Sequence, residues 1–139
     1  RVASRGLGDV YKRQEVVLPS LNNGVVVLSD RSAYSSVAYQ GEGRGLGYEK
    51  IYQLNDISIQ SNWPERVVLL DIDPEVSLSR QQVADRIGSD KVEFFQKVRK
   101  GYLKLAEEFK DSFLILNAEN NIEVNIEAIC NWLEIDNSK

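Results

Sequence analysis

Short apolar runs alternate with amphipathic stretches along most of the chain. Three runs have the length and the β-branched composition of strands that are buried in a sheet, at residues 25–29, 66–72 and 113–116. Apolar residues recur at helical spacing in six further stretches, at residues 15–21, 32–40, 48–60, 73–83, 89–109 and 124–133. Strands separated by helices predict an α/β fold with a parallel sheet and flanking helices.

The helical patterns also predict which faces are buried. The long helix at 89–109 places one apolar stripe against the core, made of Phe94, Phe95, Val98, Tyr102, Leu105 and Phe109. In the helix at 48–60, Ile51, Leu54 and Ile57 are expected on one side. The glycine-rich segment at 41–47 is expected to be flexible.

Composition narrows the class of protein. The chain has 139 residues, 42% of them hydrophobic and 27% charged, which fits one globular domain. A net charge of −4 argues against a nucleic acid or an anionic membrane as partner, and the apolar runs are too short to span a bilayer. The absence of histidine excludes Ser-His-Asp and Cys-His catalysis and His-ligated metals. We expect a cytoplasmic protein in which Cys130, the one cysteine, is a buried structural thiol.

Residues 1–14 differ from the rest of the chain. They hold four of the 17 Lys and Arg residues and one of the 21 Asp and Glu residues, with no helical or strand period. One interpretation is a disordered basic arm. The other is that residues 4–14, SRGLGDVYKRQ, resemble a translated sequencing adapter. We therefore expect an artefactual or disordered segment at 1–14 and a partial domain at 15–139.

Polar residues follow each expected strand. Asp30-Arg31 follows the first, Asp71-Ile72-Asp73 ends the second, and Asn117-Ala118 follows the third. Ligands of open parallel sheets bind at these carboxyl ends, and a guanidinium can hold a phosphate through two hydrogen bonds. Two further arginines, Arg80 and Arg86, flank a short connecting segment. On spacing alone, surface ion pairs and solvated arginines explain these residues more simply.

A longer stretch of sequence favours a specific family. Residues 28–40, LSDRSAYSSVAYQ, followed by a glycine-rich loop, resemble the signature of the thymidylate kinases. The stretches LLDIDPEVSLSR and FFQKVRKGYLKLA are similar to later parts of the same family, in the same order. The resemblance covers residues 15–133. The chain departs from the family mildly at Ser32, Glu65 and Asn117, and more clearly in a short lid between Arg80 and Arg86.

The resemblance implies a phosphate transfer from ATP to dTMP, giving dTDP, with Mg²⁺. In the dTMP site, Arg31 is expected to hold the phosphate and Asp30 to lie beside the transferring group. Ser36 and Gln40 are expected at the thymine edge, with Tyr39 against the deoxyribose. A packing role in the core is the alternative for Tyr39.

The resemblance also implies an ATP site and a homodimer. Arg80 and Arg86 are expected to be lid arginines that reach the ATP phosphates. The backbone at Asn117 and Ala118 is expected to line the adenine. No residue is assigned as a direct ligand of the metal.

One motif of such kinases is absent from the 139 residues. No Gly-x-x-x-x-Gly-Lys-[Ser/Thr] sequence occurs, although that loop supplies the backbone N–H groups and the lysine that hold ATP phosphates. We therefore expect an incomplete P-loop kinase-like sheet without its central strand, which belongs between 25–29 and 66–72. Such a chain is expected to be inactive and poorly stable. Two alternatives stay open, namely a related nucleoside or nucleotide kinase and a non-catalytic nucleotide-binding protein.

Overall fold

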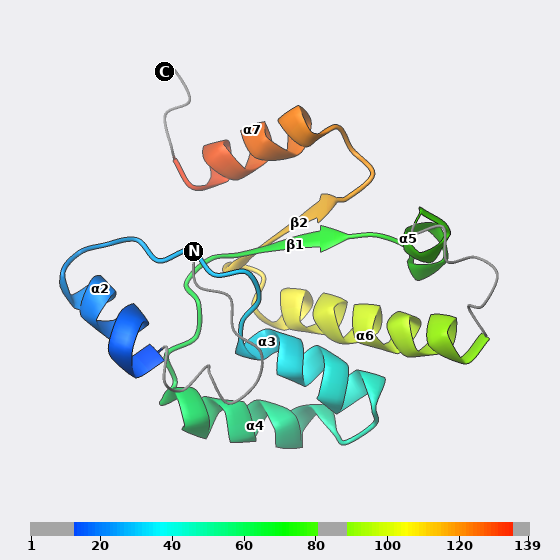
Figure 1. The fold of residues 1–139 in the computed structure, drawn as a ribbon, viewed down its shortest axis with the longest axis horizontal. Coiled ribbons are helices and arrows are strands. Elements are labelled where there is room, and N and C mark those ends of the chain that lie inside the picture. Colours follow the sequence, from blue (N-terminus) through cyan, green and yellow to red (C-terminus); the bar gives the residue numbers. More distant parts are fainter. Residues whose placement is uncertain (1–12, 81–88, 135–139) are drawn as a thin grey trace.

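The computed structural model of the chain describes residues 13–80 and 89–134. Two strands lie in the middle of the fold, with α7 (Ile122–Trp132) on one side and the helices α3 (Ala33–Ser36), α4 (Tyr48–Ile59) and α6 (Ser89–Glu108) on the other (Figure 1). The remaining helical elements are the π-helical turns η1 (Arg13–Val17) and η2 (Val37–Gly43) and the α-helices α2 (Leu18–Asn22) and α5 (Pro74–Arg80).

The two strands form a parallel pair. β1 (Val67–Asp71) pairs with β2 (Phe113–Asn117), with Val67 opposite Phe113 and Asp71 opposite Asn117. Both strands lie within one residue of the expected bounds, and the parallel α/β class is confirmed. Because the strands are parallel and in register, their carboxyl ends, with the polar residues that follow them, meet at one edge.

The expected strand at 25–29 is wrong. This segment has no regular secondary structure and pairs with no strand in the described part of the chain. Val26 is 92% exposed and Leu28 is 96% exposed, so the apolar run covers no core. A strand is stabilised by ladder hydrogen bonds and cross-strand side-chain pairs, and residues 25–29 have neither, whatever their β propensity.

The expected helices are present with shifted ends. Ser32 begins α3, and its Oγ accepts a hydrogen bond from the Tyr34 backbone N–H, as expected of an N-cap. The helical stretch continues as η2 to Gly43, so Gly41 and Gly43 are helical, which corrects the expected flexible segment. The helix expected at 73–83 is α5, which ends at Arg80, and residues 81–83 lie outside the described residues.

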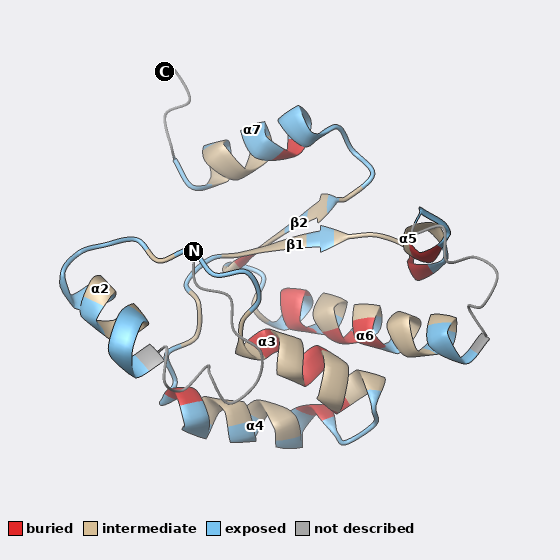
Figure 2. Cartoon of the chain, viewed as in Figure 1, coloured by how far each residue is buried: buried red, intermediate tan, exposed pale blue. Residues whose placement is uncertain are grey.

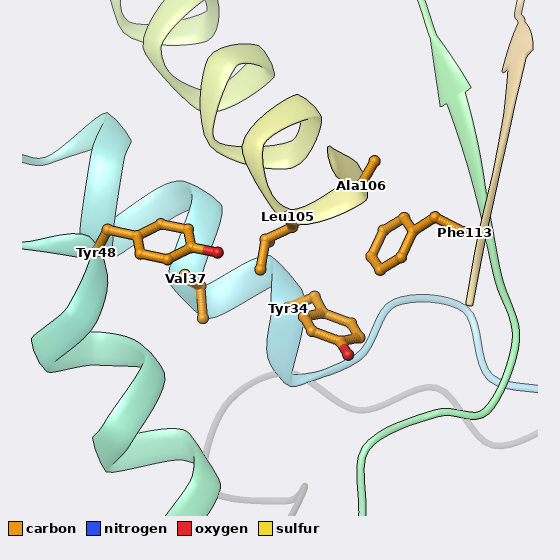
Figure 3. Close-up of a cluster of buried hydrophobic side chains, with 6 residues drawn as sticks. All are labelled: Tyr34, Val37, Tyr48, Leu105, Ala106 and Phe113. Atoms are coloured by element: carbon orange, nitrogen blue, oxygen red, sulfur yellow. The ribbon is translucent and has the colours of Figure 1, made fainter. Parts of the chain in front are cut away.

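The core lies between α3, η2, α4, α6 and the start of β2. Figure 2 shows buried positions where these elements face one another. Figure 3 shows the central side chains pointing toward one another, namely Tyr34, Val37, Tyr48, Leu105, Ala106 and Phe113. Aromatic rings extend this cluster, since Trp63 stacks on Tyr34 at 4.5 Å and on Tyr52 at 4.7 Å between ring centroids. The expected stripe of α6 is confirmed by the burial of Val98 and Leu105.

The expected apolar side of α4 is confirmed at Ile51, which packs against the core, and is wrong at Leu54 and Ile57. Leu54 is 52% exposed and Ile57 is 74% exposed, whereas Tyr48 and Ile59 are buried. A spacing of three residues drifts around a helix by about 60° at each step, so Leu54 and Ile57 turn away from the core. The spacing of eleven between Tyr48 and Ile59 returns to nearly the same side.

Two smaller expectations concern Cys130 and the bilayer. Cys130 is partly exposed, so it is not the fully buried thiol that the sequence predicted. Among the helices of the described residues, none has the length and apolarity to cross a membrane.

Candidate functional site

Two glycines allow the turn η2 to pack closely against α6. A Cβ atom on Gly43 would lie 2.8 Å from Val98 Cγ2, and a Cβ on Gly101 would lie 3.0 Å from Ala38 Cα. Only glycine allows the two elements to approach this closely. The packing fixes the position of Tyr39 and Gln40, which lie within η2. A π-helical turn inside a helix is often found at functional sites.

Arg31 has an unusual backbone conformation just after residues 25–29. Its φ angle is 69°, in the left-handed region, which costs free energy for a residue with a side chain. The Ser29 hydroxyl donates a hydrogen bond of 2.8 Å to the Arg31 carbonyl. The exposed side chain then reaches η2, where its Cζ lies 5.4 Å from the centroid of the Tyr39 ring. The structure thus brings two of the predicted dTMP residues together.

Tyr39 also packs against α6. Its ring meets Phe94, Phe95 and Tyr102 edge-on, at centroid distances of 6.1, 6.5 and 6.4 Å. Tyr39 therefore makes the core contacts of the alternative interpretation and still faces Arg31. Tyr102 donates a 2.8 Å hydrogen bond to Ser35 Oγ, which gives Ser35 a structural role. Burial raises the pKa of Tyr102, whereas that hydrogen bond and the Arg31 charge act to lower it.

Gln40 has a buried side-chain oxygen. Its Oε1 is excluded from solvent and accepts no hydrogen bond from any group in the described part of the protein. A buried acceptor without a donor is unfavourable by about 1–3 kcal/mol. Ser36, the last residue of α3, lies one turn earlier and is half-buried. Within this turn, Gln40 Oε1 is thus a buried acceptor without a hydrogen-bond donor. A donor group on a bound ligand would satisfy it.

Hydrogen bonds of two asparagines stabilise the turn at the carboxyl end of the sheet. The Ala118 N–H donates to the Asp71 carbonyl at 2.8 Å, which extends the β1–β2 ladder by one bond. The Asn117 Oδ1 atom accepts from the Glu119 N–H at 2.8 Å, and Asn125 Nδ2 donates to the Asn117 carbonyl at 3.0 Å. Asn125 is the buried polar residue of α7, so it ties this turn to the helix.

Arg80 lies next to the same turn. Its NH2 group forms an ion pair of 3.1 Å with Glu119, and both side chains are about half exposed. The structure therefore places Arg80 beside Asn117 and Ala118, the other residues predicted for the ATP site. Asp30 is exposed in the bend before Arg31. Arg86 lies outside the described residues.

Arg99 is a candidate residue that the sequence pattern did not predict. From α6 its guanidinium forms two 2.8 Å hydrogen bonds with the two carboxylate oxygens of Asp71, and a third of 3.2 Å with Asp73. The bond to Asp71 is the main cause of a raised pKa for Arg99. One signal could have identified it, since two carboxylates at a strand end require a nearby cation.

A family model described as thymidylate kinase matches residues 8–129. The chain belongs to the thymidylate kinase family. It is 37% identical over 125 residues to a thymidylate kinase of Bacillus thuringiensis and 38% identical over 125 residues to one of Bacillus cereus. Each alignment covers 86% of the chain and 60% of the relative, so the chain spans about 60% of the length of the curated relatives that it matches.

Family membership confirms the expected kinase class, and the two-stranded sheet fits part of a P-loop kinase-like fold. The match begins at residue 8, inside the segment 1–14, and the domain boundary at residue 15 stays a prediction. The ligand roles of the individual residues also stay predictions. The geometry groups them in two places, with the Arg31 guanidinium over Tyr39 of η2 and Arg80 beside Asn117 and Ala118.

Thymidylate kinases are expected to use Mg²⁺ with ATP. Within residues 13–80 and 89–134, no group of three or more Cys, Asp or Glu side chains is arranged to hold a metal ion. The strand-end carboxylates of Asp71 and Asp73 are bound by Arg99. These two carboxylates are therefore already bound by a side chain of the protein.

Proposed function

We propose that the protein phosphorylates dTMP to dTDP with ATP as the phosphate donor. The observation that best supports this substrate is the buried Gln40 Oε1 acceptor in the same helical turn as Tyr39, over which the Arg31 guanidinium lies. A pyrimidine nucleotide offers a ring N–H and an anionic phosphate on one molecule. The family match supports the reaction class.

The dTMP half of the site follows from these groups. Gln40 Oε1 accepts the N3–H of thymine, which satisfies the buried oxygen. The Arg31 guanidinium binds the phosphate through hydrogen bonds. The Tyr39 ring lies against the deoxyribose. Ser36 supplies a hydroxyl for the thymine edge, and Asp30 lies beside the transferring phosphoryl group.

The ATP half lies at the carboxyl end of the sheet. To bind the ATP phosphates, Arg80 gives up its exposed ion pair with Glu119. This costs little free energy, because exposed ion pairs stabilise a protein by about 0–1 kcal/mol. Arg86 acts with it, and the backbone at Asn117 and Ala118 lines the adenine. Mg²⁺ binds together with the phosphates and neutralises part of their charge. We also propose a cytoplasmic homodimer.

The 139-residue sequence holds no phosphate-binding loop motif of the Gly-x-x-x-x-Gly-Lys-[Ser/Thr] type. We propose that this chain by itself binds dTMP but does not turn it over. Backbone N–H groups and a lysine of that motif supply most of the charge stabilisation in phosphoryl transfer, and one such donor is worth about 3 kcal/mol.

Calorimetry with dTMP and dCMP tests the substrate. The N3 atom of cytosine is an acceptor, so dCMP leaves the Gln40 oxygen unsatisfied and should bind about ten-fold more weakly or worse. Gln40→Leu should weaken dTMP binding by a similar factor and remove the preference. Gln53→Leu, on the exposed side of α4, is the matched control and should change neither affinity. Equal binding of dTMP and dCMP by the parent chain contradicts the proposal.

Two further assays distinguish the alternatives, namely nucleotide competition and phosphate transfer by the whole protein. A related nucleotide kinase should prefer another monophosphate over dTMP in competition. A non-catalytic binding protein should bind dTMP and show no phosphate transfer even when the whole protein is assayed.

A further inference from the structure

Arg99 forms hydrogen bonds with two carboxylates at the carboxyl end of the sheet. Three of its nitrogen atoms donate to two carboxylates, with two bonds to Asp71 at the end of β1 and one to Asp73 just beyond it. The side chains of Arg99 and Asp71 are 31% and 22% exposed, so the bidentate pair is partly shielded from water. Such a pair is stronger and more directional than an exposed ion pair.

Asp73 connects this contact to α5. Its Oδ2 atom accepts from Arg99, while its Oδ1 atom accepts from the Glu75 N–H at 2.8 Å. The Ser77 N–H donates to the Asp73 carbonyl at 2.9 Å, which forms the first turn of the helix. One aspartate therefore caps α5 and also binds α6 through Arg99.

The helix α5 needs such support because it is short. Its seven residues are too few for a stable helix in isolation. Pro74 and Leu78 are buried, and α5 packs against α6. Arg80, its last residue, reaches the Asn117–Glu119 turn. The orientation of the first turn of α5 therefore sets where the Arg80 guanidinium lies.

We propose that Arg99 is a positioning residue, which fixes the start of α5 and thereby holds Arg80 at the carboxyl end of the sheet. The part of this inference that concerns nucleotide rests on the proposed function, because there Arg80 contacts the ATP phosphates. Arg99 acts through Asp71 and Asp73, since its guanidinium is already committed to both carboxylates.

Arg99 has a second effect through its charge. Asp71 and Asp73 lie at the edge of the sheet where a polyphosphate is proposed to bind. With the guanidinium removed, two carboxylates without a counter-ion would face an anionic ligand, and like charges at close range are repulsive. Both effects predict weaker ATP binding when Arg99 is replaced.

Hydrogen exchange of the 139-residue chain tests the positioning role without any ligand. Arg99→Met should speed exchange of the α5 amides by about ten-fold relative to those of β2, because loss of the ion pair frees the first turn. Arg99→Lys should give a smaller increase, since an ammonium cannot make the bidentate contact. Lys97→Met is the matched control, because Lys97 lies on the same helix in an exposed pair with Glu93 and should leave α5 unchanged.

Nucleotide affinity provides the second measurement. Arg99→Met should weaken ATP binding by about ten-fold and change dTMP binding by less than about two-fold, with partial rescue in Arg99→Lys. Unchanged α5 exchange in Arg99→Met overturns the positioning role. If Arg99→Met does not fold, parental exchange rates in Arg99→Lys overturn it equally. If the parent chain binds no ATP, the proposed ATP site fails, while the exchange result still decides the role of Arg99.

Discussion

At the scale of single residues, the most informative backbone is that of Arg31. An arginine with a φ angle of 69° is strained, because its Cβ meets its own backbone. Strain of this kind, about 1–3 kcal/mol, is retained where the rest of the structure and a function require it. In Arg31, the strained backbone conformation places the guanidinium over the Tyr39 ring.

Arg31→Gly and Arg31→Ala separate strain from charge. Both variants lose the guanidinium and should lose at least about ten-fold in dTMP affinity. Glycine tolerates a positive φ and alanine does not, so Arg31→Gly should be more stable than Arg31→Ala by about 1 kcal/mol. Chemical denaturation measures the difference. Equal stability of the two variants would show that the backbone of residue 31 is not strained in solution.

The buried tyrosines predict how stability depends on pH. Burial, followed by the nearby Tyr52 and Glu108, raises the pKa of Tyr34 to about 12. Burial and a 2.6 Å hydrogen bond to Glu108 raise the pKa of Tyr48 in the same direction. In the unfolded chain a tyrosine ionises near pH 10, so the folded state holds more protons above that pH. Both shifts stabilise the fold fully below pH 10, and the contribution of Tyr34 is lost as the pH rises toward 12.

The free energy of unfolding should therefore fall between about pH 10 and pH 12, by about 2 kcal/mol for Tyr34 alone. Denaturant titrations at several alkaline pH values measure it. Tyr34→Phe cannot ionise and should show a shallower fall, although it should unfold at a similar denaturant concentration at neutral pH. The same slope in parent and variant would rule out Tyr34 as the cause.

At the scale of elements, the contact between η2 and α6 decides the geometry of the candidate site. The sequence predicted a helix over 32–40 and a flexible glycine segment after it. In the structure the helix continues to Gly43, because glycine at positions 41 and 43 permits close packing against α4 and α6. Local propensity favours a loop at these glycines, and tertiary packing overrides it.

Gly43→Ala should destabilise the chain by about 1–3 kcal/mol, because its new methyl group collides with Val98. The Val98 side chain is buried and β-branched, so it cannot turn aside. A Val98→Ala background removes this clash but leaves Phe94 Cε2 at 2.9 Å from the new Cβ, so Gly43→Ala should cost less there than in the parent chain. Thermal unfolding of the parent chain, the two single variants and the double variant gives the coupling energy. Additive effects would mean that the two residues do not meet.

At the scale of the whole molecule, apolar side chains of the sheet and of α7 are exposed, among them Leu70, Ile115 and Ile122. Within the described residues the sheet has two strands, so each strand has one edge without a strand partner. An apolar hollow of about 220 Å³ lies between β1 and α7, lined by Leu70, Ile122, Ile126 and Ile129 among others. Val26 and Leu28, on the segment between α2 and α3, are further exposed apolar residues. Open strand edges and contiguous apolar patches promote association.

The chain should therefore self-associate at increasing concentration in sedimentation experiments. Replacing Val26 and Leu28 together by lysine should reduce association, because charge on an exposed apolar segment opposes strand pairing. Leu46→Lys, in an exposed turn remote from the sheet edge in sequence, is the matched control and should have little effect. A soluble monomer with a cooperative thermal transition at all concentrations contradicts this prediction.

The sequence by itself determined the class of fold, most of the helices, the two paired strands and the family. These features depend on local periodicity and on one long motif, and both involve residues that are close together in the sequence. The motif predicts Arg31 and Tyr39, the end of a strand predicts Asn117, and the short connecting segment predicts Arg80.

Only the tertiary structure decided which of these elements are paired and which side chains meet. The apolar run at 25–29 has the same local pattern as β1, yet it forms no strand, because pairing requires a partner that local sequence cannot supply. The contacts of Arg99 with Asp71 and Asp73 join residues 28 and 26 positions apart, and no periodicity encodes them. Long-range contacts arise when helices pack on the sheet, so their partners are known only once the chain is folded.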